Sequence, residues 1–407
     1  MIMKNHFILI FRYFSLFVLI AIINLAISCT GNYRSDDDEM NRHEESLCPY
    51  IYTYNGEEYV FAGEIISGAS KPGLERYDYL LLSELKPNHD QYFIKLTNEV
   101  KQVHYINKLQ LKVIDHPENV GVLIDKHGQL QTISKPVLPK SAVTFTGRSI
   151  LPEISKKDNY TYNFDEIVLT QETTDDIILS WQKPQYSNQA KLIIRAKNSL
   201  WLEHVFSSFH ELFGARYNYF SRLQDSKSKE YYHNWMIEQS IPLLVYLEKD
   251  GKWELYDIFE IAGTMAMKDN VLLINTRTIK SETINIKLET GFKFWELDYA
   301  AMDFTRNLPL KITTVTIAEA IDENKVDVKL KLLNDDQSYY TQTKIGNEAN
   351  LTFPAQELTD ESRTVILESK GYYHIIREQQ GRAKMIEIMS FREPGRMPLF
   401  SRELYEE

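Results

Sequence analysis

Short stretches in which apolar and polar residues alternate recur along most of this chain of 407 residues. The clearest stretch places Ile284, Ile286 and Leu288 at every second position, with polar residues between them. Residues 109–113 repeat the pattern with leucine and valine. Successive side chains of a strand point to opposite faces, so this period of two predicts strands with one buried face and one solvated face. The chain is therefore predicted to be mainly β.

Turn signals and prolines divide these strands into regions. In the first region, 48–135, Asn55-Gly56 stands between two aromatic runs and predicts a hairpin. Residues 136–163 hold three prolines and many polar residues, so we predict a linker there. Residues 305–407 are predicted to form a C-terminal β region that packs with the first region. The remaining stretch, 164–304, is predicted to be a separate domain.

The middle region changes its period part-way. Apolar residues recur at helical spacing before Gly214, which suits the end of a helix: Leu202, Val205, Phe206, Phe209, Leu212 and Phe213. We predict helices near 200–213 and 227–238, inserted between strands. With its strand–helix–strand opening and Trp253 on an edge-like strand, the region resembles a jelly-roll β-sandwich of the galactose-binding-like type. That resemblance concerns the fold and implies no sugar binding by itself.

The N-terminus has the plan of a secretory signal. Lys4 and Arg12 flank an apolar run that is shorter than the ~20 residues a spanning helix needs. Leu25-Ala26-Ile27-Ser28-Cys29 resembles a bacterial lipobox, although Ala26 stands where leucine is usual. The resemblance implies a signal peptide over 1–28 and a lipid, such as palmitate, on Cys29.

An acidic run follows the cysteine. Ser35, Asp36, Asp37, Asp38 and Glu39 resemble the export signal that sends Bacteroidota lipoproteins to the outer face of the outer membrane. Residues 29–47 lack an apolar period and are predicted to be a flexible acidic tether. The expected location is therefore the outer membrane, with the chain anchored by lipid and facing the cell exterior.

Charge and cysteine content exclude some classes of function. The net charge of −11 argues against nucleic acid as a partner, because polyanions need a basic surface. The chain has two cysteines, so lipid on Cys29 would leave Cys48 unpaired. A Cys29–Cys48 disulfide in an uncleaved chain is the alternative. Tyrosine is abundant, which suits either strand packing or a carbohydrate-binding face.

Several short motifs in the flanking regions carry a second resemblance: Cys48-Pro49-Tyr50, Leu96-Thr97-Asn98-Glu99, Val113 to Pro117, Leu367 to Tyr373 and Phe400-Ser401-Arg402. They resemble segments of bacterial extracytoplasmic proteins that carry FG-GAP, tetratricopeptide or ASPIC/UnbV-type modules, relatives of animal cartilage acidic protein. The resemblance implies a β-rich extracytoplasmic module and assigns no catalytic residue. The propeller and helical repeats of such proteins are not found in this sequence.

The strongest candidate for chemistry is an acidic strand near residue 296. In a regular strand, Glu296 and Asp298 share one face while Trp295, Leu297 and Tyr299 share the other. With Asp303, these carboxylates offer oxygen ligands for Ca²⁺, the one cofactor the sequence suggests. They also suit acid/base work in a glycosidase. The third interpretation, a solvated face beside a buried aromatic one, is the most common outcome for such a pattern.

Tyr231, Tyr232 and Trp235 lie on one side of the second predicted helix and form either an aromatic platform or a packing stripe. His210-Glu211 lacks the second histidine of a zinc-protease motif, because position 214 is glycine. No nucleophile motif occurs, so the catalytic residues are unknown. We therefore expect a surface lipoprotein that acts as a binding or structural module for a glycan or protein. The alternative is a surface enzyme acting on glycans through Glu296, Asp298 or Asp257.

Overall fold

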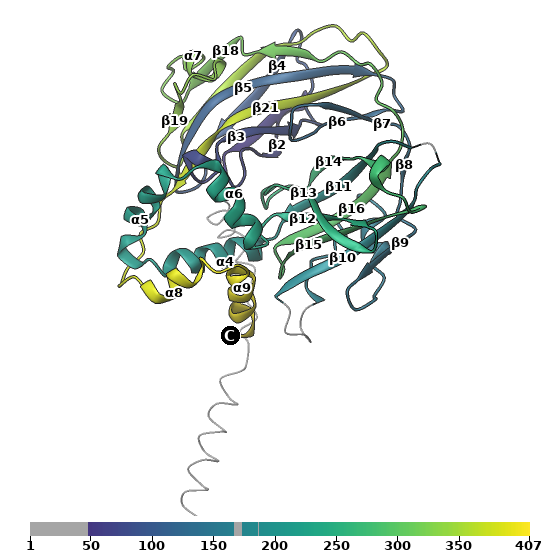
Figure 1. Cartoon of the computed structure of the whole chain (residues 1–407). Coiled ribbons are helices and arrows are strands. Elements are labelled where there is room, and N and C mark those ends of the chain that lie inside the picture. Colours follow the sequence, from purple (N-terminus) through teal and green to yellow (C-terminus); the bar gives the residue numbers. More distant parts are fainter. Residues whose placement is uncertain (1–47, 167–172, 186) are drawn as a thin grey trace, which may run out of the picture. The chain divides into compact units, whose positions relative to one another are not determined.

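A computed structural model describes residues 48–166, 173–185 and 187–407, which form two β-sandwiches and a group of helices (Figure 1). The strand ladders are antiparallel. The prediction of a mainly β fold built from sandwiches is therefore confirmed. The predicted signal, anchor and tether, with Cys29 and residues 35–39, lie outside the described residues.

The first sandwich takes its strands from both flanking regions. One sheet has the order β18-β20-β4-β1-β2, and the other has the order β17-β5-β21-β3 with β19 also paired to β5. The strands are β1 (Tyr50–Tyr54), β2 (Tyr59–Glu64), β3 (Arg76–Leu81), β4 (Gln91–Thr97), β5 (Gln102–His116), β17 (Thr313–Thr316), β18 (Glu319–Asp322), β19 (Tyr340–Gln342), β20 (Glu348–Pro354) and β21 (Ser362–Ile375). Residues of both sheets share one apolar core.

The alternating pattern explains this core. Leu109, Leu111 and Val113 of β5 all enter it, as the period of two requires. A smaller cluster lies on the opposite face of β5, where the hairpin of β6 (Gly121–Ile124) and β7 (Leu130–Ile133) packs. The predicted Asn55-Gly56 turn connects β1 to β2, and the Asn55 side chain accepts hydrogen bonds from two backbone N–H groups of that turn.

The second sandwich is a jelly roll. Its strands are β8 (Pro136–Val137), β9 (Ser141–Thr144), β10 (Thr174–Gln182), β11 (Ala190–Asn198), β12 (Leu243–Lys249), β13 (Lys252–Phe259), β14 (Lys268–Ile274), β15 (Thr283–Gly291) and β16 (Trp295–Asp303). The sheet β14-β11-β16-β8 shares a core with the sheet β13-β12-β15-β10-β9. Apart from the β12–β13 hairpin, strands from β10 onward alternate between the two sheets, as in a jelly roll.

The stretch 136–163 is not the linker that its prolines predicted. It supplies β8, which pairs with the end of β16, and β9, which pairs with β10. It also forms the short helix α3 (Leu151–Ile154). The reason is position: Pro136 lies on the edge strand β8, where its missing N–H group costs little, Pro139 lies between β8 and β9, and Pro152 stands in the first turn of α3. The sandwich therefore begins well before residue 164.

Both predicted helices are present in the insertion between β11 and β12. They are α4 (Leu200–Glu211) and α6 (Lys229–Glu238), and α5 (Tyr217–Leu223) lies between them. Serine caps each long helix: the Ser199 hydroxyl accepts from the backbone N–H of Leu202, and the Ser228 hydroxyl accepts from that of Tyr231. Short 3₁₀ turns complete the connections: η4 (Gly214–Arg216) and η5 (Gln224–Ser226).

The end of the chain is helical, which corrects the prediction of a β region up to residue 407. Helices α8 (Met385–Ser390) and α9 (Arg396–Glu406) follow β21. Phe391, Met397 and Phe400 pack into the core of the jelly roll and not into the core of the first sandwich. Trp201 anchors α9 through a 2.8 Å hydrogen bond from its indole N–H to the Ser401 hydroxyl. The remaining short elements are α7 (Leu330–Leu333), η2 (Pro72–Leu74) and η6 (Thr276–Thr278).

Polar contacts connect the two sandwiches between β3 and both the start of β14 and the segment before it. Lys268 Nζ lies 2.5 Å from Asp78 Oδ1. The Arg76 guanidinium donates to the carbonyl of Ile261 at 3.1 Å. In the described part of the chain, no helix combines the length and the apolar character needed to cross a membrane.

Candidate functional site

The acidic strand predicted as the main site is β16, and a β-bulge changes its two faces. Tyr299 pairs with Arg195 and Leu297 pairs with Ala196, which leaves Asp298 as the extra residue of the bulge. Trp295 and Leu297 enter the core, as predicted, but Tyr299 does not join them. Beyond the bulge, Ala300 and Met302 take the inward positions.

The predicted calcium ligands each have partners within the protein. Glu296 forms an ion pair of 3.3 Å with Lys197, and the Arg195 guanidinium donates to Asp298. Asp303 is fully buried and accepts 2.7 Å hydrogen bonds from two consecutive backbone N–H groups, those of residues 134 and 135. Among residues 48–166, 173–185 and 187–407, no three acidic, histidine or cysteine side chains are grouped as a metal site. Calcium binding stays a prediction, and a bound ion would compete with these cations.

Asp257, the other acidic residue considered for catalysis, lies on β13 in the opposite sheet of the jelly roll. It forms an ion pair with Lys126, in the turn between β6 and β7. Thus Glu296, Asp298 and Asp257 each face a cation, and Asp257 does not share a sheet with the other two. Among the described residues, these three carboxylates do not form a pair that converges on one cleft. The glycan-enzyme hypothesis stays a prediction.

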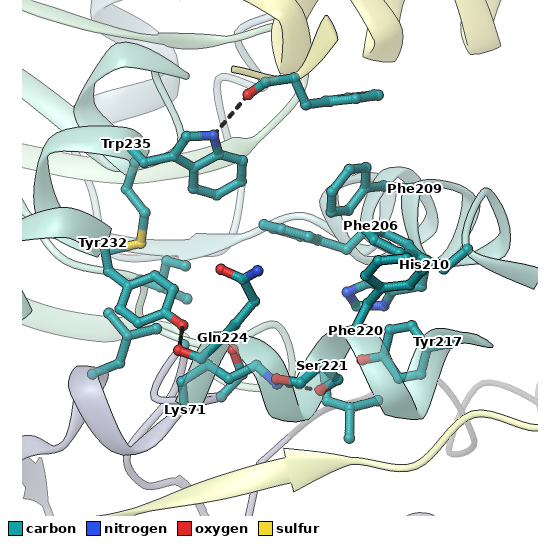
Figure 2. A pocket seen from close by; sticks show the side chains of 18 of the residues that line it. Lys71, Phe206, Phe209, His210, Tyr217, Phe220, Ser221, Gln224, Tyr232 and Trp235 are labelled. Carbon is teal, nitrogen blue, oxygen red and sulfur yellow. Dashed lines mark hydrogen bonds between the residues drawn. The ribbon is translucent and has the colours of Figure 1, made fainter. Parts of the chain in front are cut away.

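The aromatic residues of α6 lie at a cavity of about 460 Å³ (Figure 2). Tyr231, Tyr232 and Trp235 all border it, and their role as an aromatic platform stays a prediction. Trp235 also packs against the jelly-roll core, and its indole N–H donates to the carbonyl of Phe391 at 2.8 Å. Tyr232 donates to the carbonyl of Gln224 at 2.6 Å. These bonds fix the two rings while leaving ring surface towards the cavity.

Helix α4 forms the facing wall. Leu202 and Val205 of its apolar stripe are buried in the jelly-roll core, whereas Phe206, Phe209 and, just after the helix, Phe213 are only partly buried and border the cavity. The jelly-roll sandwich therefore covers only part of the apolar stripe of α4. Figure 2 shows Phe206 and Phe209 opposite Tyr232 and Trp235, with open space between the two groups.

A polar wall closes one side of the space. Lys71 from the loop before η2 donates from its ammonium group to the Ser221 carbonyl at 3.0 Å and also to the Ser221 hydroxyl. Asp225 Oδ1 lies 3.9 Å from the same Nζ atom. The Gln224 side chain rises from this wall into the space in Figure 2, and His210 faces it from α4.

Burial and charge set the protonation of this wall. Burial lowers the pKa of Lys71 to about 8, and Asp225 opposes that shift. Burial lowers the pKa of His210 to about 3, assisted by the positive charges of Arg377 and Lys71. Lys71 is therefore mostly cationic at neutral pH, while the His210 imidazole is neutral. The buried Nδ1 atom of His210 has no hydrogen-bond partner in the described part of the chain.

The cavity is open to solvent on the side of α8. Met385, Met389, Leu223 and Tyr231 border it, and each of these side chains is also exposed at the surface. Residues that line the cavity and are also exposed mark its mouth.

Cys48 borders another part of the cavity, and burial raises the pKa of its thiol. Because Cys29 lies outside the described residues, the two alternatives for Cys48 stay open.

Sequence reasoning found one wall of this site and missed the others. Tyr231, Tyr232 and Trp235 were predicted as a group, and the phenylalanines of α4 were predicted as a packing stripe. Lys71 was missed because nothing in the sequence of its loop connects it to α5. His210 was considered only for zinc chemistry; its place beside Phe209 in an apolar stripe was the available signal.

No protein-family model matches the chain, and no curated protein matches it. One similar solved structure is a β-porphyranase of glycoside hydrolase family 86 from the human gut bacterium Bacteroides plebeius. It is 9% identical with a TM-score of 0.17, and the match covers 58% of this chain and 38% of that one. Another is Sulfolobus Turreted Icosahedral Virus, at 8% identity and a TM-score of 0.16, covering 74% and 91% of the two chains. Such low TM-scores support no inference, and the resemblance to FG-GAP-type proteins stays a prediction.

Proposed function

We propose that this chain is a binding protein that holds a small apolar molecule in the cavity between α4, α5, α6 and α8. The observation that carries the proposal is the aromatic lining of a space of about 460 Å³. Ligand sites typically enclose about 300–1,000 Å³, with mostly apolar walls and a few polar groups. An unfilled apolar space of this size loses packing contacts, so a ligand that fills it stabilises the protein.

The mouth of the cavity supports an apolar ligand over a polar one. Met385, Met389 and Leu223 present apolar surface to water where the cavity opens. Clusters of exposed apolar side chains commonly mark binding sites, because they lose unfavourable contact with water when a partner covers them. The side chain of Ile386, on the same short helix, is 91% exposed and extends this apolar rim.

We also propose, from the sequence, that a lipid on Cys29 anchors the chain to the outer membrane and that the acidic run directs it to the cell surface. Replacing Cys29 with serine removes the thiol that would carry the lipid. The Cys29→Ser variant is expected to move from the detergent phase to the aqueous phase in phase partitioning. Unchanged partitioning would contradict the anchor and leave the cavity proposal untouched.

A cavity-blocking variant tests the binding function. The Gln224 side chain points into the space and makes no hydrogen bond with the described residues, so Gln224→Trp fills the cavity without removing a partner. We expect the full chain to bind N-phenyl-1-naphthylamine, an uncharged dye that fluoresces in apolar surroundings. The variant should bind it at least about tenfold more weakly.

The matched control is Gln356→Trp, which adds the same side chain at an exposed position. It should bind the dye like the wild type, and both variants should keep the wild-type melting temperature. If the full chain does not bind the dye, or if Gln224→Trp binds it as tightly as Gln356→Trp does, the proposed function is wrong.

A further inference from the structure

We infer that the ligand of this cavity carries a carboxylate at one end of its apolar body, and that Lys71 binds this group. The inference rests on the proposed function and names the ligand class of the same site. It is carried by the arrangement of the polar wall, where a cation and unused hydrogen-bonding atoms meet beside an otherwise apolar space (Figure 2).

Lys71 has more hydrogen-bond donors than it uses within the protein. An ammonium group has three donors, and Lys71 directs two hydrogen bonds to the carbonyl and hydroxyl of Ser221. The Asp225 carboxylate, at 3.9 Å, is beyond hydrogen-bond distance. One ammonium N–H therefore remains for a ligand. A buried cation is stabilised most by a partner that is both charged and within hydrogen-bond distance.

The neighbouring groups favour one negative charge. Among the lining side chains, Lys71 and Arg392 are cationic and Glu203 is anionic; behind the wall, Asp225 and Arg377 add one charge of each sign, so one net positive charge remains. His210 stays neutral at physiological pH, and Arg377 acts on it as a further positive charge. A monoanion neutralises this excess, whereas a dianion would overcompensate it beside Asp225.

Neutral donors and acceptors complete the head-group site. His210 offers an imidazole with no hydrogen bond to the described residues, and Gln224 offers a carboxamide that points into the space. Buried polar groups are normally hydrogen-bonded, so such groups on a cavity wall indicate a polar atom brought by the ligand. A carboxylate has two oxygen atoms, enough to accept from Lys71 and from one of these neutral groups together.

The test compares two probes that differ only in the head group, dodecanoate and dodecan-1-ol, titrated into the full chain at neutral pH. Dodecanoate should bind about tenfold more tightly than the alcohol, because a hydrogen bond to a charged partner is the stronger kind. In Lys71→Met this preference should fall to within about twofold, while the alcohol binds as in the wild type. Lys280→Met, at an exposed lysine, is the matched control and should keep the preference.

The wild type gives a second measurement that does not depend on how Lys71→Met folds. The groups around Lys71 are Asp225 of η5, His374 of β21, His210 of α4, Tyr217 of α5, Tyr232 of α6 and Arg377. Burial lowers the pKa values of both histidines and raises those of both tyrosines, to about 12 for Tyr217. Lys71, with a pKa of about 8, is thus the group expected to change charge just above neutral pH.

The dodecanoate preference should therefore be present at about pH 7 and lost by about pH 9.5, as the ammonium group loses its proton. If both probes bind equally at neutral pH, or if Lys71→Met keeps the full preference, the carboxylate inference is overturned and the binding function stands. If neither probe binds, the proposed function itself fails.

Discussion

At the scale of single residues, two buried carboxylates outside the cavity each face a cation within the protein. Asp78 at the seam between the sandwiches faces Lys268 and accepts from the backbone N–H of Ile66 at 2.8 Å. Asp298 in the β16 bulge likewise faces Arg195. Lys71 differs from these pairs, because its counter-ion Asp225 lies at 3.9 Å, beyond hydrogen-bond distance, and because Lys71 borders a cavity.

Asp78 gives a prediction for stability and its pH dependence. Burial opposes ionisation of this carboxyl, but Lys268, Arg76 and hydrogen bonds outweigh it and hold its pKa below the usual value. Because its folded-state pKa is lowered, the ionised Asp78 carboxylate stabilises the folded protein at pH values above its unfolded-state pKa of about 3.9. This stabilisation disappears as the pH falls through the folded-state pKa. Asp78→Asn should lower the free energy of unfolding by about 3–5 kcal/mol at neutral pH, because it leaves a nearly buried lysine without its counter-ion.

The difference between Asp78→Asn and the wild type should shrink as the pH is lowered below about 4, since the carboxyl of the unfolded wild type then binds a proton that the folded protein binds only at lower pH. Denaturant unfolding at several pH values measures it. Asp90→Asn, at an exposed position, is the control and should stay within about 0.5 kcal/mol of the wild type. A difference for Asp78→Asn that does not change with pH would contradict this account of the seam.

At the scale of elements, patterns of apolar residues predicted most strands and both long helices. The alternation in β15 and the stripe of α4 each report burial directly, so both could be found from the sequence. Edge strands and bulges could not be found from the sequence. The three prolines of residues 136–163 suggested a linker because the sequence does not show that β8 lies at an edge, and the bulge at Asp298 depends on pairing with β11.

At the scale of the whole molecule, the chain interleaves two sandwiches. The first is built from strands on both sides of the jelly roll in sequence, through pairings such as β4 with β20 and β5 with β21. Local patterns carry no information on such pairings, and they did not predict that α9 packs on the jelly roll. The cavity arises at this scale, because its walls come from the loop at Lys71, from the insertion and from α8.

We propose this cavity as the binding site for an apolar acid. The most direct measurement is a crystal structure of the full chain grown with dodecanoate. We expect the alkyl chain between the aromatic side chains of α4 and α6, with the carboxylate within hydrogen-bond distance of Lys71 Nζ. A cavity that is closed by its own side chains, or dodecanoate bound only elsewhere on the protein, would contradict it.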